Sequence, residues 1–309
     1  MPAPGRVCYG KRAISLLPFD IQPVFGLCLV KIPLASSTVS SPTRGYYMPS
    51  TLSNAEFLKI RKNSFHSLPS DMKDIEDIAG AVRHYQTIAN KSCGIIYYYL
   101  TRYVREISTA WHDKPFSDIS ILDWGTGWGQ NALSLKSLGG NISACDVPVP
   151  VADEHRGDFF TRHGIPFKML EHEYLLPFEE GSFDVVLSFG VLEHVPDDKN
   201  SLSELHRVLR PGGLFICLFL PYSLSWTQHL FGLLGKEVHD RLYSRAQVRG
   251  LLAGAGFSLH DMWFRQLFPK NKVHYPAPNI WERIDQCLVD HTPLKYLSTN
   301  LEFISSKNR

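Results

Sequence analysis

The chain has 309 residues, 44% of them apolar, and a formal net charge of only +2. This composition suffices for an ordinary buried core, and the small charge excludes the dense basic surface that is typical of nucleic-acid binding. No apolar run reaches the ~18 residues needed to span a bilayer. The six cysteines show neither a C-x-x-C pair nor a metal-ligand spacing, so we expect reduced thiols in an intracellular protein and no metal site. They are Cys8, Cys28, Cys93, Cys145, Cys217 and Cys287.

The segment 1–47 differs in composition from the rest of the chain. Pro and Ser are dense between Pro33 and Ser50, and Asp20 is the only acid in the first 55 residues. Three interpretations fit: a disordered tail, an upstream extension of a gene that starts at Met48, or an organelle transit segment. The first two predict a cytoplasmic protein, and the third predicts a mitochondrial one.

Helical periodicity begins after this segment. Between Asp71 and Trp111 the apolar residues recur at helical spacing, which predicts two helices. We therefore assign residues 48–116 to an N-terminal helical cap and residues 117–309 to the main domain.

The most informative motif follows a short apolar run, Ile119 to Leu122. It reads Asp-Trp-Gly-Thr-Gly-Trp-Gly over residues 123–129, and an amphipathic stretch starts at Gln130. This order predicts a strand, a glycine turn and a helix. Glycines at alternate positions let the backbone approach a ligand, and the helix N-terminus offers free N–H groups to an anionic group. The dinucleotide fingerprint G-x-G-x-x-G would need glycine in place of Gln130, so the spacing favours another nucleoside-type cofactor.

Further motifs follow at regular distances. A second strand, Asn141 to Cys145, ends in Asp146, about 20 residues past the glycines, where a carboxylate accepts hydrogen bonds from ribose hydroxyls. The later segments are Leu176-Pro177-Phe178, a buried strand from Phe183 to Phe189, the run from Val191 to Val195, the helix end from Leu205 to Gly213, and a strand from Leu214 to Leu220.

In their order, these motifs resemble the small-molecule branch of the class I S-adenosylmethionine-dependent methyltransferases. They are acid-x-G-x-G-x-G, L-P-F, F-D-V-V, L-E-H-V and L-R-P-G-G. The resemblance covers Ile119 to Leu220, roughly a third of the chain. It implies an α/β fold with a Rossmann-like, seven-stranded, mainly parallel sheet and helices on both faces. The L-E-H-V motif resembles the quinone-precursor O-methyltransferases in particular. No Asn/Asp-Pro-Pro-aromatic motif follows the fourth strand, which disfavours methylation of nucleic-acid bases.

The resemblance also implies roles for single residues toward S-adenosylmethionine. The three glycines would approach the aminoacid part of the cofactor, Asp123 would support its ammonium group, and Asp146 would hold the ribose. The family usually has an acid where His172 stands, so its neighbour Glu173 is expected to take over the adenine contact. The candidate cofactor-binding residues are Asp123, Trp124, Gly125, Thr126, Gly127, Gly129, Asp146, Val147, His172, Glu173 and Ser188.

The acceptor side is predicted from fewer residues. His194, next to Glu193 and just beyond the fourth strand, is the candidate base if the acceptor must lose a proton; the alternative is a structural role in its loop. The resembling family places an N-terminal helical segment over the cofactor, which makes Tyr85 a candidate for the acceptor pocket. Tyrosines at helical spacing also fit simple packing.

The carboxyl-terminal third contains two insertions, at about 221–241 and 268–299. The first contains Trp226, a further candidate substrate residue, and is interpreted as a lid, as a patch that lies on a membrane, or as a helix docked on the core. Ser244 and Gln247 form the pattern of a capping box. By the resemblance, Leu301 to Ser305 is the last strand and runs antiparallel to its neighbours.

The sequence thus predicts methyl transfer from S-adenosylmethionine to a small organic or lipid-like acceptor, with no nucleic-acid partner. Peripheral contact with a membrane is compatible with the first insertion, and the oligomeric state stays open. Two alternatives remain: a nicotinamide-dependent oxidoreductase, which Gln130 disfavours, and a non-catalytic S-adenosylmethionine-binding scaffold.

Overall fold

The computed structural model describes residues 52–66, 91–236, 239, 241–270, 273 and 275–308. All of them fall within the unit Tyr47–Arg309. The expectations for segment 1–47, for the first of the two helices after Asp71, and for Tyr85 lie outside the described residues. The division of the chain at residue 116 stays a prediction.

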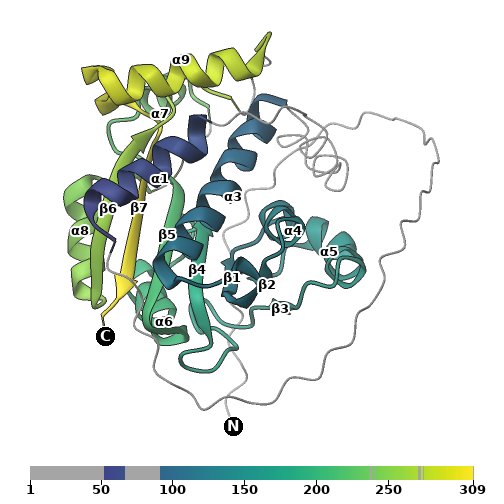
Figure 1. Ribbon diagram of the computed structural model, residues 1–309. Helices are drawn as coiled ribbons and strands as arrows, with labels where there is room; N and C mark the ends of the chain where they lie inside the picture. Colours follow the sequence, from purple (N-terminus) through teal and green to yellow (C-terminus); the bar gives the residue numbers. More distant parts are fainter. Residues whose placement is uncertain are drawn as a thin grey trace. The chain divides into compact units, whose positions relative to one another are not determined.

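Seven strands form one sheet in the order β3-β2-β1-β4-β5-β7-β6 (Figure 1). All neighbouring strands are parallel except β7, which runs antiparallel to both β5 and β6. This arrangement confirms the predicted fold class and the antiparallel last strand. The strands are β1 (Ser120–Trp124), β2 (Asn141–Asp146), β3 (Phe167–Met169), β4 (Phe183–Phe189), β5 (Leu209–Pro221), β6 (Phe257–Arg265) and β7 (Asn300–Lys307).

Helices cover both faces of the sheet. The α-helices are α1 (Asn54–His66), α3 (Lys91–His112), α4 (Gln130–Ser137), α5 (Pro150–Arg162), α6 (Asp198–Val208), α7 (Trp226–Leu233), α8 (Arg245–Gly254) and α9 (Pro278–His291), and two short 3-10 helices are η1 (Phe116–Asp118) and η2 (Pro293–Leu297). The predicted capping box is present at the start of α8, where Ser244 and Gln247 bond each other's backbone N–H. In the part of the chain that is described, no helix is long and apolar enough to cross a membrane.

Two apolar cores result from the alternation of side chains along the strands. Val185 and Leu187 of β4 point to one face, where they join α1, α3, α4 and α5. Val186 points to the other face and packs with α6 and α8. Figure 1 shows α1 and α3 crossing the first of these faces. Because β4 is buried on both sides, it reads in the sequence as a continuous apolar run.

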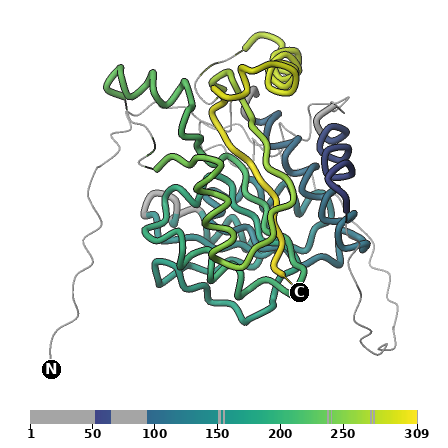
Figure 2. The backbone as a smooth tube through the Cα atoms, turned by 90° about the vertical axis from the view of Figure 1, so that its left-hand side faces the viewer, coloured from purple at the N-terminus to yellow at the C-terminus, as the bar shows by residue number. Residues whose placement is uncertain are grey.

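The strand order also determines where a ligand can bind. The chain builds β1, β2 and β3 outward to one edge and then returns to place β4 on the other side of β1. In open α/β sheets this reversal leaves a crevice at the carboxyl ends of the two strands, here at Trp124 and Phe189. Both insertions lie at this end of the sheet, since α7 follows β5 and α9 follows β6 (Figure 2).

Candidate active site

The glycine loop after β1 lies directly on the tip of β2. The backbone N–H groups of Gly125 and Thr126 both donate to the carbonyl of Cys145, at 2.9 and 3.1 Å. The N–H of Gly127 donates to Oδ2 of Asp146 at 2.7 Å. The fold therefore brings the predicted glycine motif and the predicted ribose carboxylate into direct contact.

The three positions of this loop require glycine for different physical reasons. All have positive φ angles, +69° at Gly125, +59° at Gly127 and +86° at Gly129. A Cβ at Gly125 would lie 2.5 Å from the side chain of Val191, and one at Gly129 would lie 2.4 Å from the ring of Phe159. These two positions need glycine for protein packing. A Cβ at Gly127 would have only the Gln130 side chain near, at 4.0 Å, so this glycine leaves room for a ligand.

Asp123 is the group that best fits a cationic part of a ligand. Its side chain is buried, and Oδ2 accepts a hydrogen bond from the Thr126 hydroxyl at 2.6 Å. Oδ1 finds no hydrogen-bond partner among the described residues. Burial raises the pKa of this carboxyl to about 7, against the opposing effect of the Thr126 bond. A buried carboxylate oxygen without a partner is costly, and the ammonium group of S-adenosylmethionine would satisfy it.

Asp146 differs from Asp123 because both of its oxygens are already bonded. Oδ1 accepts from the N–H of Val147 at 2.7 Å, and Oδ2 accepts from Gly127 and from the guanidinium of Arg156 at 3.1 Å. Burial raises the pKa of Asp146, while Arg156 opposes that rise. Arg156 was not predicted from the sequence, since nothing in its spacing marks it as a neighbour of the glycine loop.

The remaining cofactor candidates differ in their burial. The side chain of Trp124 is buried in the core on the α6 side of the sheet. Ser188 is fully buried, in register with Trp124 on β1 and with Cys217 on β5. His172 and Glu173 are exposed. Nδ1 of His172 accepts hydrogen bonds from the backbone N–H groups of Tyr174 and Leu175, each at 3.3 Å. Their roles toward a cofactor stay predictions.

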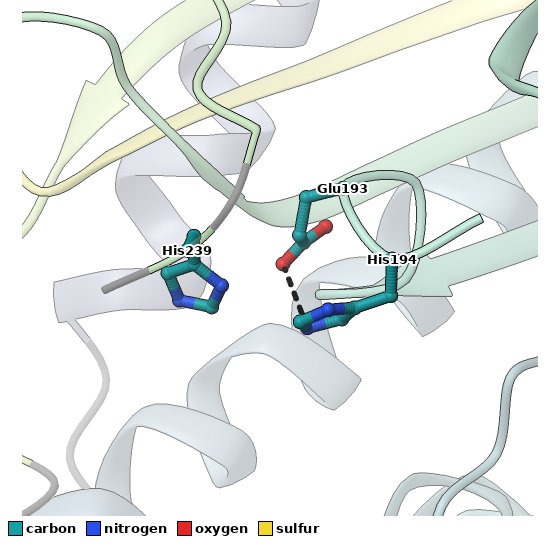
Figure 3. Close-up of side chains that lie close together, drawn as sticks. All are labelled: Glu193, His194 and His239. Carbon is teal, nitrogen blue, oxygen red and sulfur yellow. Dashed lines mark ion pairs between the residues drawn. The ribbon is translucent and has the colours of Figure 1, made fainter. Parts of the chain in front are cut away.

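A second cluster lies on the loop after β4, where Glu193, His194 and His239 converge (Figure 3). Oε1 of Glu193 is 3.8 Å from Nε2 of His194, and the rings of the two histidines are 5.3 Å apart. Glu193 is buried, whereas the His194 side chain is 62% exposed. The three ligand atoms lie within 4.8 Å of one another, so the trio is spaced to surround one cation. His239 comes from the first insertion and was not predicted.

Glu193 is unusual within this cluster. Its Oε2 atom is buried and finds no hydrogen-bond partner in the described part of the chain. Burial raises the pKa of its carboxyl to about 7. Two side chains fix the backbone of this loop. The Tyr243 hydroxyl donates to the carbonyl of Leu192 at 3.1 Å, and Arg241 donates to the carbonyl of Val195 at 3.0 Å.

Aromatic side chains border the same loop. The ring of Tyr97 on α3 lies 6.3 Å from Phe189 and 5.3 Å from Phe219, and the two phenylalanine rings are 6.2 Å apart. A Cβ on Gly190 would lie 3.4 Å from Oε1 of Glu193 and 3.7 Å from Phe219. The three rings and the carboxylate therefore share one neighbourhood.

Trp226 lies apart from these groups in the described contacts. It begins α7, and its indole N–H donates to the carbonyl of Leu267 at 2.7 Å, which fastens α7 to the loop after β6. The burial of the α7 side chains does not match the alternative that this helix docks its apolar face on the core. Only Thr227 is buried in this helix, and Leu233 is 86% exposed.

Comparison with known proteins identifies the family. A family model described as a methyltransferase domain matches residues 122–217. A ubiquinone biosynthesis O-methyltransferase of Paramagnetospirillum magneticum is 31% identical over 192 residues, which are 58% of this chain and 72% of that protein. The chain belongs to the class I S-adenosylmethionine-dependent methyltransferases. The cofactor of this family is S-adenosylmethionine, and none of the comparisons supports the oxidoreductase or the non-catalytic alternative.

Two further proteins share a smaller fraction of identical residues with this methyltransferase. The ubiquinone biosynthesis O-methyltransferase of Maricaulis maris is 28% identical over 163 residues, 48% of this chain, so the chain spans only 62% of that relative. Among solved structures, a methyltransferase of Haloferax volcanii, in complex with the Trm112 methyltransferase activator, is similar with a TM-score of 0.48 and 16% identity, over 84% of this chain and 98% of that one.

Proposed function

We propose that this methyltransferase transfers the methyl group of S-adenosylmethionine to an oxygen atom of a small organic acceptor. The observation that carries the proposal is the contact between Val191 and Gly125. Through this contact the loop with Glu193 and His194 lies against the glycine loop, which supports a joint site. Oxygen as the acceptor atom is supported by the relatives, which are named O-methyltransferases.

The protein's own groups would position the acceptor and remove its proton. When bound, S-adenosylmethionine supplies a methyl group that is already activated, so positioning and exclusion of water can provide much of the rate. His194 is the proposed proton acceptor, and the Glu193 carboxylate 3.8 Å away would stabilise the imidazolium that forms. The rings of Tyr97, Phe189 and Phe219 suit a planar aromatic acceptor that bears the reacting hydroxyl.

We further propose an acceptor with an apolar tail, taken from a lipid surface. Four leucines on and beside α7 are exposed, at the same end of the sheet as the site. They are Leu224, Leu230, Leu233 and Leu234. A helix that keeps such side chains in water at a ligand-binding edge suits peripheral contact with lipid better than packing on its own core. We place the protein in the cytoplasm, with the mitochondrion as the alternative if segment 1–47 is a transit segment.

The test is a transfer assay with phenolic probes. The protein is incubated with S-adenosylmethionine and either 3,4-dihydroxybenzoate or its dodecyl ester in phosphatidylcholine vesicles, and S-adenosylhomocysteine is quantified by mass spectrometry. We expect turnover of both probes, with a lower KM for the ester, and His194→Ala and Glu193→Gln should lower kcat by about 10²- to 10⁴-fold. His291→Ala, an exposed histidine on α9, is the matched control.

Four results would contradict parts of this proposal. No transfer to either probe would exclude a phenolic oxygen as acceptor. Full activity of both His194→Ala and Glu193→Gln would exclude the proton-accepting pair. Loss of wild-type activity on adding a chelator, restored by a divalent cation, would assign the trio to a cation instead. An ester KM that Leu233→Glu leaves unchanged would exclude α7 from lipid contact.

A further inference from the structure

Arg156 on α5 joins three parts of the cofactor site through one buried guanidinium. Its Nε donates to the carbonyl of Gly127 at 2.9 Å, and Nη1 donates to the carbonyl of Val147 at 2.9 Å and to Asp153 at 3.2 Å. Nη2 donates to Oδ2 of Asp146 at 3.1 Å. Arg156 is only 4% exposed, so these bonds form away from water.

The planar guanidinium suits this task better than other cations. It carries five N–H donors in a fixed fork, and Arg156 uses them on two loops at once, the glycine loop and the tip of β2. Figure 1 shows α5, which carries Arg156, beside the β2–β3 edge of the sheet. Loss of the side chain would leave the two carbonyls and the carboxylate without a buried cation to bond.

The protonation state of Asp146 matters for the cofactor, because the ionised carboxylate offers acceptor positions on both oxygens, whereas the protonated form replaces part of this capacity with an O–H donor. Burial favours the protonated form of Asp146, and Arg156 is the largest opposing influence on its pKa. A carboxylate has about four acceptor positions. The bonds from Gly127, Val147 and Arg156 occupy three of them, which leaves one for a ribose hydroxyl.

We propose that Arg156 is a positioning residue of the cofactor site, which holds Asp146 oriented toward the ribose and fixes the glycine loop against β2. This inference rests on S-adenosylmethionine binding in the crevice between β1 and β4. Two other roles predict different results. An Arg156 that only strengthens the fold leaves the affinity for the cofactor unchanged, and an Arg156 that blocks the ribose site has to leave before the cofactor binds.

Calorimetric titration with S-adenosylhomocysteine separates these roles. We expect Arg156→Ala to weaken binding at least tenfold and Arg156→Lys to weaken it less, because an ammonium group can replace only part of the fork. Arg162→Ala, an exposed arginine on the same helix, is the matched control and should bind as the wild type does. Thermal unfolding and circular dichroism establish that each variant is folded at the titration temperature; Arg156→Lys keeps the test decisive if Arg156→Ala does not fold.

A ligand without the ribose 2′-hydroxyl supplies the readout that a purely structural role would not change. The wild type should bind 2′-deoxy-S-adenosylhomocysteine more weakly than S-adenosylhomocysteine, and this ratio should shrink in Arg156→Lys and vanish in Asp146→Asn. Unchanged affinity in folded variants, or an unchanged ratio, would overturn the inference, and tighter binding would show that Arg156 blocks the site. If the wild type binds neither ligand, the proposed function fails together with the inference.

Discussion

Two aspartates beside the glycine loop have the same side chain but different surroundings. Asp123 and Asp146 are both buried, but Asp146 has an arginine partner and two backbone N–H groups, whereas Oδ1 of Asp123 has no described partner. A buried carboxyl group without a cationic partner favours its neutral form in the fold and its ionised form beside a bound cation. Asp123 should therefore make cofactor binding depend on pH.

The affinity for S-adenosylhomocysteine should rise about tenfold between pH 6 and pH 8, as Asp123 loses its proton near pH 7. Stability should change in the opposite direction. The pKa of Asp123 is raised in the fold from 3.8 to about 7, so the unfolded chain releases this proton first, and stability is lost as pH rises from about 4 to 7. Titrations at both pH values check the first effect and urea unfolding checks the second. Asp123→Asn should remove both, and an unaltered pH dependence in this variant would refute the assignment.

Two glycines with nearly the same positive φ angle allow the effect of steric crowding on stability to be measured separately from backbone strain. Gly129 and Gly139 have φ angles of +86° and +89°. A Cβ at Gly129 would meet Phe159 at 2.4 Å, whereas a Cβ at Gly139 has nothing within 4 Å. Gly139→Ala should cost about 1 kcal/mol of unfolding free energy, and Gly129→Ala should cost about 1–3 kcal/mol more. Equal losses in urea unfolding would mean that Phe159 does not pack against the loop.

At the scale of elements, α9 departs most from what its sequence indicates. Its buried residues are Glu282, Asp285 and Val289, while Ile280 is 59% exposed. The carboxylates face the sheet because Lys270, itself buried, bonds both of them and Arg265 lies within 3.4 Å of Glu282. The helix is amphipathic, so hydrophobic periodicity would place its apolar face against the core, whereas the fold buries its carboxylate face instead.

Breaking this buried charge cluster should loosen the second insertion. Glu282→Ala leaves Lys270 and Arg265 with fewer partners, and we expect a loss of about 3–5 kcal/mol in unfolding free energy. Ile284→Ala, an exposed position on the same helix, should cost under about 0.5 kcal/mol. Hydrogen exchange should locate the extra opening in α9. A Glu282→Ala protein as stable as the wild type would show that the cluster does not hold the helix.

The parts of the fold that were predicted correctly share a physical property. β1, β2 and β4 are short apolar runs that end at a glycine turn or at a strand-tip carboxylate, so local sequence was sufficient for them. β5 was predicted from Leu214, but it already starts at Leu209, where a helix end and a turn were expected. Arg156 and His239 belong to the site through contacts with residues that are distant in sequence, at Gly127 and His194, and no local pattern marks such contacts. The same holds for the unpartnered oxygen of Glu193, because burial depends on the whole fold.

At the scale of the whole unit, strand order brings the two halves of the site together. The glycine loop follows β1 and the Glu193 loop follows β4, and these strands are neighbours although about 60 residues separate them in the sequence. The contact of Val191 with Gly125 is the direct result. Both insertions lie at this same carboxyl edge, which suits a site closed by α7 and α9 around an acceptor.

The central claim is that this crevice binds S-adenosylmethionine, and calorimetric titration tests it most directly. The ligands are S-adenosylmethionine and S-adenosylhomocysteine, with NADH as the control, and the proteins are the wild type and Asp146→Ala. We predict micromolar binding of both sulfur nucleosides by the wild type, its loss in the variant, and no heat from NADH. Binding of NADH alone, or of neither sulfur nucleoside by folded wild-type protein, would contradict the account.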